Sequence, residues 1–342
     1  MNVERRAGLS YAEFEREYLL PRRPVILVDV LGKCPAATKW TPDYFKNLLG
    51  SKVVSTDGGP MRIDEVIDGI VKPGGVGRAP FLRERPVPWV LPELLSDLEP
   101  FPVHAAPNWF EYPFARWADP FRYGFGAMLN RLAQTDINVT GAGMSFPVLH
   151  LDRFHCHALI MQWHGRKEFF VFAPDQTPYL YPNANGDVST VDSVENPDLE
   201  RFPLFAKAKM VRLTLNPGEA LFNPSGWWHT TRTLDPSIAT VISFGNRSNW
   251  NEVIRHMIPK GRLGLLKLAP FAAYLFLLGL FRLPGYEFEN PAKVATAKRA
   301  FQHFQRIRGQ AFASTWEIGA AFGDPAPAVN SVDSTKVADT AT

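Results

Sequence analysis

Three side chains with metal-binding chemistry stand in two motifs that lie far apart in the chain. The first motif is His150-Leu151-Asp152, and the second, Gly226-Trp227-Trp228-His229, ends on a histidine. Two imidazoles and one carboxylate can form a facial triad that holds Fe(II) on one side and leaves the other coordination positions open. A His-x-Asp pair alone is weak evidence, because the chain contains 8 histidines and such pairs also cap turns. The surrounding sequence therefore has to decide between these interpretations.

The elements that must position these side chains are short strands, which begin at Ile137. Apolar segments alternate there with turn residues such as Asn216-Pro217-Gly218, a pattern that favours a β-sandwich or jelly roll. An antiparallel jelly roll can bring the His150 loop beside the strand that carries His229 and leaves a barrel mouth open for substrate. We expect strands over residues 158–163, 168–172, 210–215, 219–222, 227–232 and 238–244.

The first part of the chain is predicted to mix helices and strands. Ser10 and Glu13 form a capping box, which opens a helix that must end before Pro21. Thr41-Pro42 begins a second helix, which is expected to end at Gly50. Further segments are a strand over 24–30, a strand over 52–56, a short helix over 63–71, and loops over 72–125 that are rich in Pro, Gly and aromatic residues.

Composition excludes several classes of protein. The net charge of +3 implies no strong nucleic-acid footprint, so no nucleic-acid partner is expected. Only Cys34 and Cys156 are present, which rules out a disulfide framework and suits a reducing compartment. The N-terminus lacks the apolar segment of a secretory signal peptide, and we therefore expect a cytoplasmic protein, or a nucleocytoplasmic one in a eukaryote.

The apolar segment 268–281, LAPFAAYLFLLGLF, complicates this assignment. As a helix it would span about 21 Å, less than the roughly 30 Å hydrocarbon core of a bilayer. We favour a buried or dimer-forming helix, so that the C-terminal helices would make a homodimer. A peripheral membrane contact through 268–281 and a true membrane span stay open as alternatives.

Further motifs surround the triad in a fixed order. With them, residues 10–250 resemble the Jumonji-C / cupin-like family of Fe(II)- and 2-oxoglutarate-dependent oxygenases, and within it the smaller protein hydroxylases. The motifs are Pro24-Val-Ile-Leu, Trp40-Thr-Pro-Asp-Tyr-Phe, His150-Leu-Asp152, Gln162-x-x-Gly165-x-Lys167, Phe172-Ala-Pro174, Leu180-Tyr-Pro182, Ser193-Val, Asn196-Pro-Asp198, Phe202-Pro203, Asn216-Pro-Gly-Glu219 and Asn223-Pro-Ser-Gly-Trp-Trp-His229.

The resemblance implies the fold class and the domains. It implies a mainly β protein with flanking helices, whose centre is a double-stranded β-helix (a jelly roll) with N-terminal α/β elements and a C-terminal helical region. We expect N-terminal helices, strands and wrapping loops over 1–125, the jelly-roll catalytic core over 126–250, and a helical region over 251–323. Residues 324–342 are poor in large apolar side chains, which is typical of a disordered tail.

The resemblance also implies roles for single residues. His150, Asp152 and His229 would bind Fe(II), and Lys167 would pair with the distal carboxylate of the cosubstrate 2-oxoglutarate. Hydroxyl contacts to the cosubstrate could come from Ser145 in place of the missing threonine and, after His229, from Thr231, Thr240 or Ser243, between which the sequence does not decide.

The chain departs from the family at two of these positions. Close relatives often have a threonine three residues before the first histidine, where this chain has Pro147, and an asparagine where it has Ala158. The cosubstrate contacts are therefore atypical, whereas the triad is complete.

The implied reaction hydroxylates a carbon centre while 2-oxoglutarate and O2 become succinate and CO2. The hydroxylase relatives favour a protein side chain as substrate. Demethylation ranks lower, because two cysteines leave no zinc-finger spacing for a chromatin reader. The alternatives are a small-molecule hydroxylase, a jelly-roll metalloenzyme that does not use 2-oxoglutarate, and a non-catalytic jelly-roll interaction scaffold.

Other polar and aromatic residues lie next to the triad in the sequence. His155, Cys156 and His157 are interpreted as a polar loop around a small core cysteine, with a second metal site or a substrate-contacting shell as the alternative. Of Trp227 and Trp228, one should pack in the core and the other should line the entrance, because successive strand residues face opposite sides.

Overall fold

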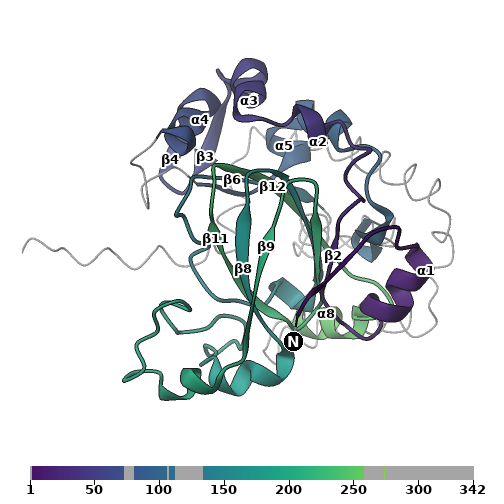
Figure 1. Ribbon diagram of the computed structural model, residues 1–342, viewed down its shortest axis with the longest axis vertical. Helices are drawn as coiled ribbons and strands as arrows, with labels where there is room; N and C mark the ends of the chain where they lie inside the picture. Colours follow the sequence, from purple (N-terminus) through teal and green to yellow (C-terminus); the bar gives the residue numbers. More distant parts are fainter. Residues whose placement is uncertain (1, 73–80, 106–107, 112–133, 258–272, 274–342) are drawn as a thin grey trace, which may run out of the picture.

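The computed structural model describes residues 2–72, 81–105, 108–111, 134–257 and Ala273. Two β-sheets face each other, and helices cover the outer side of the larger sheet (Figure 1). This arrangement confirms the predicted jelly roll. The expectations for the apolar segment 268–281, apart from Ala273, and for the tail 324–342 lie outside the described residues.

The larger sheet has seven strands in the order β1-β2-β10-β7-β12-β6-β5. Its neighbours are antiparallel except for β1 and β2, which run parallel. The strands are β1 Glu4–Arg6, β2 Val25–Leu27, β5 Leu82–Pro86, β6 Thr135–Thr140, β7 His157–His164, β10 Ala220–Asn223 and β12 Ser237–Phe244.

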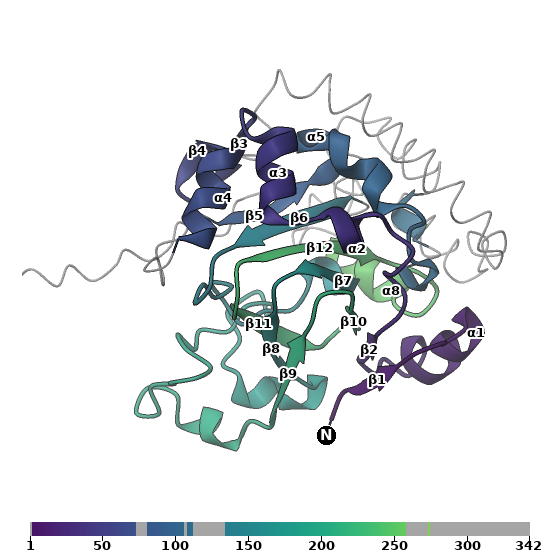
Figure 2. The ribbon, with the colours of Figure 1, turned by 45° about the horizontal axis from the view of Figure 1, so that its top comes forward.

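The smaller sheet has the order β11-β8-β9, with β8 Lys167–Phe172, β9 Met210–Leu215 and β11 Trp228–Thr233. The chain before Asp152 extends this sheet, because Ser145 forms a bridge with Arg232 and His150 forms one with His229. Figure 2 shows the smaller sheet lying beneath β10, β7 and β12. Apolar side chains fill the space between the two sheets: Ile26, Ala158, Ile160, Phe169, Val171, Leu213, Leu215, Leu221 and Trp227.

A helical layer packs on the outer face of the larger sheet (Figure 2). A two-stranded ribbon of β3 Val53–Thr56 and β4 Gly59–Arg62 lies beside it. The layer and the N-terminal segment comprise α1 Tyr11–Phe14, the π-helix η1 Glu15–Leu19, α2 Ala36–Lys39, α3 Pro42–Leu49, α4 Ile63–Val71, α5 Val87–Val90, and the 3-10 helices η2 Pro92–Leu98, η3 Val103–Ala105 and η4 Trp109–Glu111.

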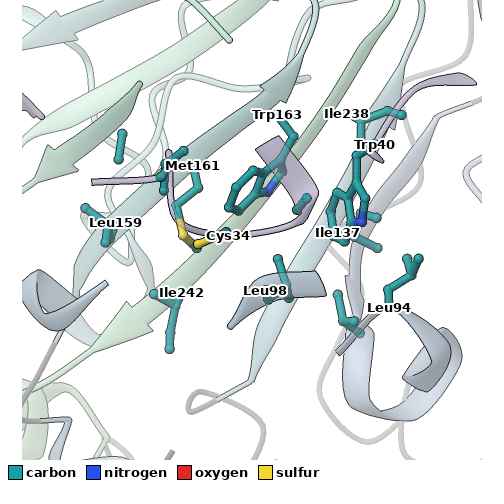
Figure 3. Packing of buried hydrophobic residues seen from close by; sticks show 14 of the residues in the cluster. Cys34, Trp40, Leu94, Leu98, Ile137, Leu159, Met161, Trp163, Ile238 and Ile242 are labelled. Carbon is teal, nitrogen blue, oxygen red and sulfur yellow. The ribbon is translucent and has the colours of Figure 1, made fainter. Parts of the chain in front are cut away.

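The main apolar core lies between the helical layer and the larger sheet. Met161 and Trp163 of β7 point outward there and pack with Cys34 and Trp40, as Figure 3 shows. Alternate residues of the same strand face the barrel interior instead, because successive side chains in a strand point to opposite faces. The face of each polar residue on β7, β10 and β12 can therefore be assigned from its neighbours.

A second layer covers the outer face of the smaller sheet. It consists of η6 Pro174–Tyr179, η7 Pro203–Lys207 and the chain between them. Phe170, Phe172 and Trp228 pack there with Phe202 and Phe205. Both faces of β8 and of the start of β11, the strand that carries His229, are thus buried.

The N-terminal predictions are confirmed at the level of single caps. Both hydrogen bonds of the Ser10–Glu13 capping box are present, and the Thr41 side chain caps α3, which ends at Gly50. The helix predicted over 63–71 has these same bounds. The remaining described helices are η5 Arg153–His155 and α8 Trp250–Met257.

Within the part of the chain that the structure describes, none of the helices combines the length and the hydrophobicity that a membrane span requires.

Candidate metal centre

The backbones of His150 and His229 are paired across the edge of the smaller sheet. The His150 N–H donates to the His229 carbonyl oxygen at 3.0 Å, and the His229 N–H donates to the His150 carbonyl oxygen at 2.9 Å. Directly opposed residues in an antiparallel pair place their side chains on the same face. The two ring centroids accordingly lie 4.3 Å apart.

Asp152 joins these histidines from the turn that follows. The Leu151 N–H donates to the Asp187 carbonyl oxygen, and Asp152 then precedes η5. Its Oδ1 atom lies 3.9 Å from Nε2 of His229. One ligand atom from each of His150, Asp152 and His229 lies within 4.8 Å of the others, so the structure brings the three predicted ligands together as a group that could hold a metal ion.

Hydrogen bonds orient both imidazoles for metal binding through Nε2. His150 Nδ1 lies 3.1 Å from the Val148 carbonyl oxygen, and His229 Nδ1 lies 3.4 Å from that of Trp227. A carbonyl oxygen only accepts, so each contact requires the proton on Nδ1 and leaves Nε2 with a free lone pair. The Phe146 ring stacks on His150 at 4.6 Å and limits its rotation.

The protonation states of the three side chains suit a divalent cation. Burial lowers the pKa of His150 and of His229 to about 4, so both rings are neutral at pH 7. Burial raises the pKa of Asp152 to about 6, against the opposing effects of His150 and of a hydrogen bond from Asn223. Neutral imidazoles and an ionised carboxylate are the forms that bind a metal. Two nitrogens and one oxygen on one side of the site fit Fe(II) in a facial triad.

Asn223 is a neighbour of the triad that was not predicted, although it lies in the motif that ends at His229. Its Nδ2 atom lies 3.1 Å from Oδ2 of Asp152 and 3.2 Å from Nδ1 of His229. The sequence feature that could have indicated its role is a polar residue at the end of an otherwise apolar strand.

Glu84 is a second residue that the sequence did not reveal. Burial dominates the lowered pKa of His150 and of His229, and the Glu84 carboxylate acts on both in the opposite direction. Glu84 has a φ of 48° and lies in an irregular stretch of the pairing between β5 and β6. The sequence placed it in a Pro- and aromatic-rich loop, where nothing marked it as a neighbour of the triad.

Lys167 begins β8 and shares the inward face of that strand with Phe169 and Val171. The side chain is buried, and burial lowers its pKa to about 8. Among the described residues, no carboxylate forms an ion pair with it. His229 lies opposite Val171 in the register, so Lys167 and the triad occupy different levels of one barrel interior. Four residues of strand separate these levels, roughly 13 Å.

The turn that delivers Lys167 explains the motif Gln162-x-x-Gly165-x-Lys167. The Gln162 Nε2 atom lies 2.7 Å from the His164 carbonyl oxygen, 2.9 Å from that of Gly165 and 2.8 Å from the Ser237 hydroxyl. Its two N–H groups are shared among these three oxygens. Gly165 has a φ of 66°, and a Cβ there would lie 2.1 Å from the Pro236 carbonyl oxygen. Only glycine fits this turn, which holds the start of β8 in place.

Three of the hydroxyl candidates have different positions. Ser243 pairs with Ala158 and faces the barrel interior. Ser145 is exposed at the edge of the smaller sheet. The prediction that Thr240 contacts the cosubstrate is wrong. Thr240 lies fully buried on the opposite face of β12, where it accepts a hydrogen bond from Trp163 Nε1 at 2.8 Å. We therefore remove Thr240 from the candidate cosubstrate contacts.

The expectation that Trp227 or Trp228 lines the entrance is wrong. Trp227 packs inside the barrel and donates to the Arg22 carbonyl oxygen, whereas Trp228 packs in the outer layer and donates to Thr177. The two rings do face opposite sides, but both sides are covered. The prediction that Cys156 is a small core residue is confirmed, since it is fully buried.

Comparisons with known proteins agree with this architecture. Residues 129–248 match the family described as "Cupin-like domain". The chain is similar to "HSPB1-associated protein 1" of Rattus norvegicus (42% identity over 99 residues, 28% of this chain and 20% of that protein). It is similar to "Lysine-specific demethylase JMJ21" of Arabidopsis thaliana (29% identity over 296 residues, 78% and 28%) and to "Lysine-specific demethylase 8" of Xenopus tropicalis (28% over 255 residues, 69% and 50%).

These relatives refine the expected activity. The chain spans half or less of the length of each of them, with shares of 20%, 28% and 50%. Two of these three relatives are named as lysine-specific demethylases. The ranking of demethylation below hydroxylation is thus not supported.

Proposed function

We propose that the protein is an Fe(II)- and 2-oxoglutarate-dependent oxygenase of the cupin-like JmjC family that oxidises a carbon centre of a protein side chain. The match of residues 129–248 to the cupin-like domain and the similarity to two relatives named as demethylases support this proposal. The observation that carries the proposal is the convergence of His150, Asp152 and His229, with ligand atoms within 4.8 Å, inside the same barrel as Lys167. A scaffold has no need of three such ligands, of which His229 is buried and the other two are partly buried, together with Lys167. The demethylase names of two relatives support a side chain as substrate.

Each residue of the centre has a defined task in this proposal. His150 and His229 would each bind the metal through Nε2, with Nδ1 held by a backbone carbonyl oxygen. Asp152 would supply the negative charge. When bound, Fe(II) would supply the redox chemistry that couples the oxidation of 2-oxoglutarate by O2 to the oxidation of a carbon–hydrogen bond.

Lys167 would bind the cosubstrate from the far level of the barrel. Its ammonium group is a point charge that suits a carboxylate, and the apolar walls around it exclude water. Leu215 and Thr233 flank Lys167 in the register. A lysine side chain and a short dicarboxylate together can bridge roughly 13 Å of strand. The inward Ser243 is the hydroxyl that we retain as a further contact.

Hydroxylation and demethylation begin with the same step in this proposal. Hydroxylation of an N-methyl carbon gives an unstable product that releases formaldehyde, whereas hydroxylation of a chain carbon gives a stable alcohol. The substrate, and not the centre, would decide between the two outcomes. Mass spectrometry of peptides after incubation would distinguish a gain of one oxygen from the loss of a methyl group.

The test of the proposal is the conversion of 2-oxoglutarate to succinate by the full chain with added Fe(II). Wild-type protein should form succinate, and Asp152→Ala should lose at least about 100-fold of that activity together with its bound iron, because the only anionic ligand is gone. Asp192→Ala, which removes an exposed carboxylate paired with Arg201, is the matched control and should resemble wild type. Equal iron content and turnover in Asp152→Ala would contradict the assignment of the triad.

A further inference from the structure

Asn223 is a buried polar side chain at the inward end of β10. Ala220 and Phe222 of this strand pack in the outer core, whereas Leu221 packs inside the barrel. The strand alternation therefore turns Asn223 inward as well. It is 1% exposed, and its Oδ1 atom is buried without a hydrogen-bond partner among the described residues. A buried amide in an apolar strand is unfavourable unless its contacts compensate.

The compensating contact is with the candidate ligand Asp152, and the candidate ligand His229 lies beside it. Nδ2 donates to Asp152 Oδ2 at 3.1 Å and lies 3.2 Å from His229 Nδ1. The second contact depends on the ring: when His229 carries its proton on Nδ1, that proton is directed to the Trp227 carbonyl oxygen instead. The bond to Asp152 does not depend on this choice, because an ionised carboxylate only accepts.

This hydrogen bond gives the two oxygens of the Asp152 carboxylate different surroundings. Oδ2 is held by Asn223, while Oδ1 is the oxygen that lies 3.9 Å from Nε2 of His229. A carboxylate that turned about its axis could offer both oxygens to a metal and occupy an extra coordination position. A donor fixed on Oδ2 prevents that rotation, since turning the group would break a buried hydrogen bond.

We propose that Asn223 is the positioning residue of the metal centre: its amide holds Oδ2 of Asp152, so that Asp152 binds the metal through Oδ1 alone and the remaining positions stay open. The inference rests on the proposed metal function of the triad. Hydrogen bonds to metal ligands from neighbouring side chains typically change metal affinity by about 10- to 100-fold when they are removed.

The test is Co(II) binding to the full chain, followed by titration and by the visible absorption of the bound ion, which reports its coordination. Asn223→Leu, which keeps the size and removes the amide, should bind Co(II) about 10- to 100-fold more weakly and with an altered spectrum. Asn223→Ser, which keeps a small hydrogen-bonding group, should recover part of the affinity. It also serves as the second variant if the leucine variant does not fold.

The matched control is Gln176→Leu. It also converts a buried, hydrogen-bonded amide to leucine, but on η6, where Gln176 accepts from the Lys209 N–H. It should lose stability yet keep the wild-type affinity and spectrum. A folded Asn223→Leu or Asn223→Ser with wild-type affinity and spectrum would overturn the inference. Failure of the wild-type chain to bind Co(II) would instead overturn the metal centre itself.

Discussion

Lys167 places an ammonium group in a buried position, where its charge depends on pH. Its pKa is lowered from 10.5 to about 8 by burial, so the charged fraction falls as the pH rises through about 8. A carboxylate partner would stabilise the charged form and move this transition upward. A buried lysine without a carboxylate partner is costly for the fold, and cosubstrate binding is the event that would offset this cost.

Lys167→Met should therefore weaken the binding of 2-oxoglutarate by about 10- to 100-fold, the equivalent of the roughly 1.5–3 kcal/mol of a hydrogen bond to a charged group. In wild-type protein the affinity should also decline as the pH rises above about 8, and the variant should lack this decline. Calorimetric titration of 2-oxoglutarate into the Mn(II)-loaded protein at several pH values measures both effects. Equal affinity in wild type and variant would favour a jelly-roll metalloenzyme that does not use this cosubstrate.

Strand alternation limits which single residues can share a face of the sheet. Thr240 and Ser243 are three positions apart on β12, so they cannot both face the barrel interior. The sequence could not choose between them, because a bulge between Ile238 and Ala239 shifts the register. Asn223 and Glu84 could not be assigned at all, because their roles come from contacts between distant segments.

At the scale of elements, the predictions succeeded where strands are apolar and bounded by turns. Strands β7 to β12 match the expected segments within one residue at each end. β1 and β5 were missed, because ERR and LRERP are rich in charge and show no apolar alternation. Each of these two strands lies at an edge of the larger sheet, where one side has no neighbour to demand apolar residues.

His157 joins three elements at the open end of the barrel. Its Nδ1 accepts from the Ser225 N–H at 3.0 Å, so the proton is on Nε2, which donates to the Ser248 hydroxyl at 2.7 Å. The residue thereby connects β7 with the loop before His229 and with the chain that leads to α8. This neutral, fully buried ring is structural, and the contacts support the interpretation of a polar loop over a second metal site.

His157 should make the fold sensitive to acid. Burial lowers its pKa to about 3, from 6.5 in a solvated ring. The unfolded chain thus binds more protons between these values, and stability falls as the pH drops from about 6.5 to 3, by at most about 1.4 kcal/mol per pH unit. His157→Asn should be less stable at pH 7, by about 1–3 kcal/mol, but should show a flatter acid dependence. Urea unfolding in the presence of a chelator at pH 7, 6, 5 and 4 measures the free energy of unfolding of both proteins. An equal pH dependence of this free energy in wild type and variant would contradict the prediction.

At the scale of the whole molecule, the N-terminal segment and α8 are joined behind the metal centre. Arg22 Nη1 lies 3.0 and 2.8 Å from the two carboxylate oxygens of Glu252, and its Nη2 donates to the Ser248 carbonyl oxygen at 2.7 Å. The Arg22 carbonyl oxygen accepts from Trp227, two residues before His229. Segments from both parts of the chain thus hold the loop that presents the second histidine.

This junction should appear as an energetic coupling between Arg22 and Glu252. Glu252→Gln keeps the side-chain size, Arg22→Gln shortens the side chain, and both remove the charge, so a double-mutant cycle measures the interaction of the two residues. Both side chains are about one-third exposed, which limits the coupling to about 0.5–1 kcal/mol, because solvent screens such pairs. Thermal unfolding of the four proteins measures it. Because the interaction stabilises the fold and does not contact a ligand, the Co(II) affinity should change much less than in Asn223→Leu. If the stability losses of the two single variants add up to that of the double variant within about 0.3 kcal/mol, the two residues are not energetically coupled.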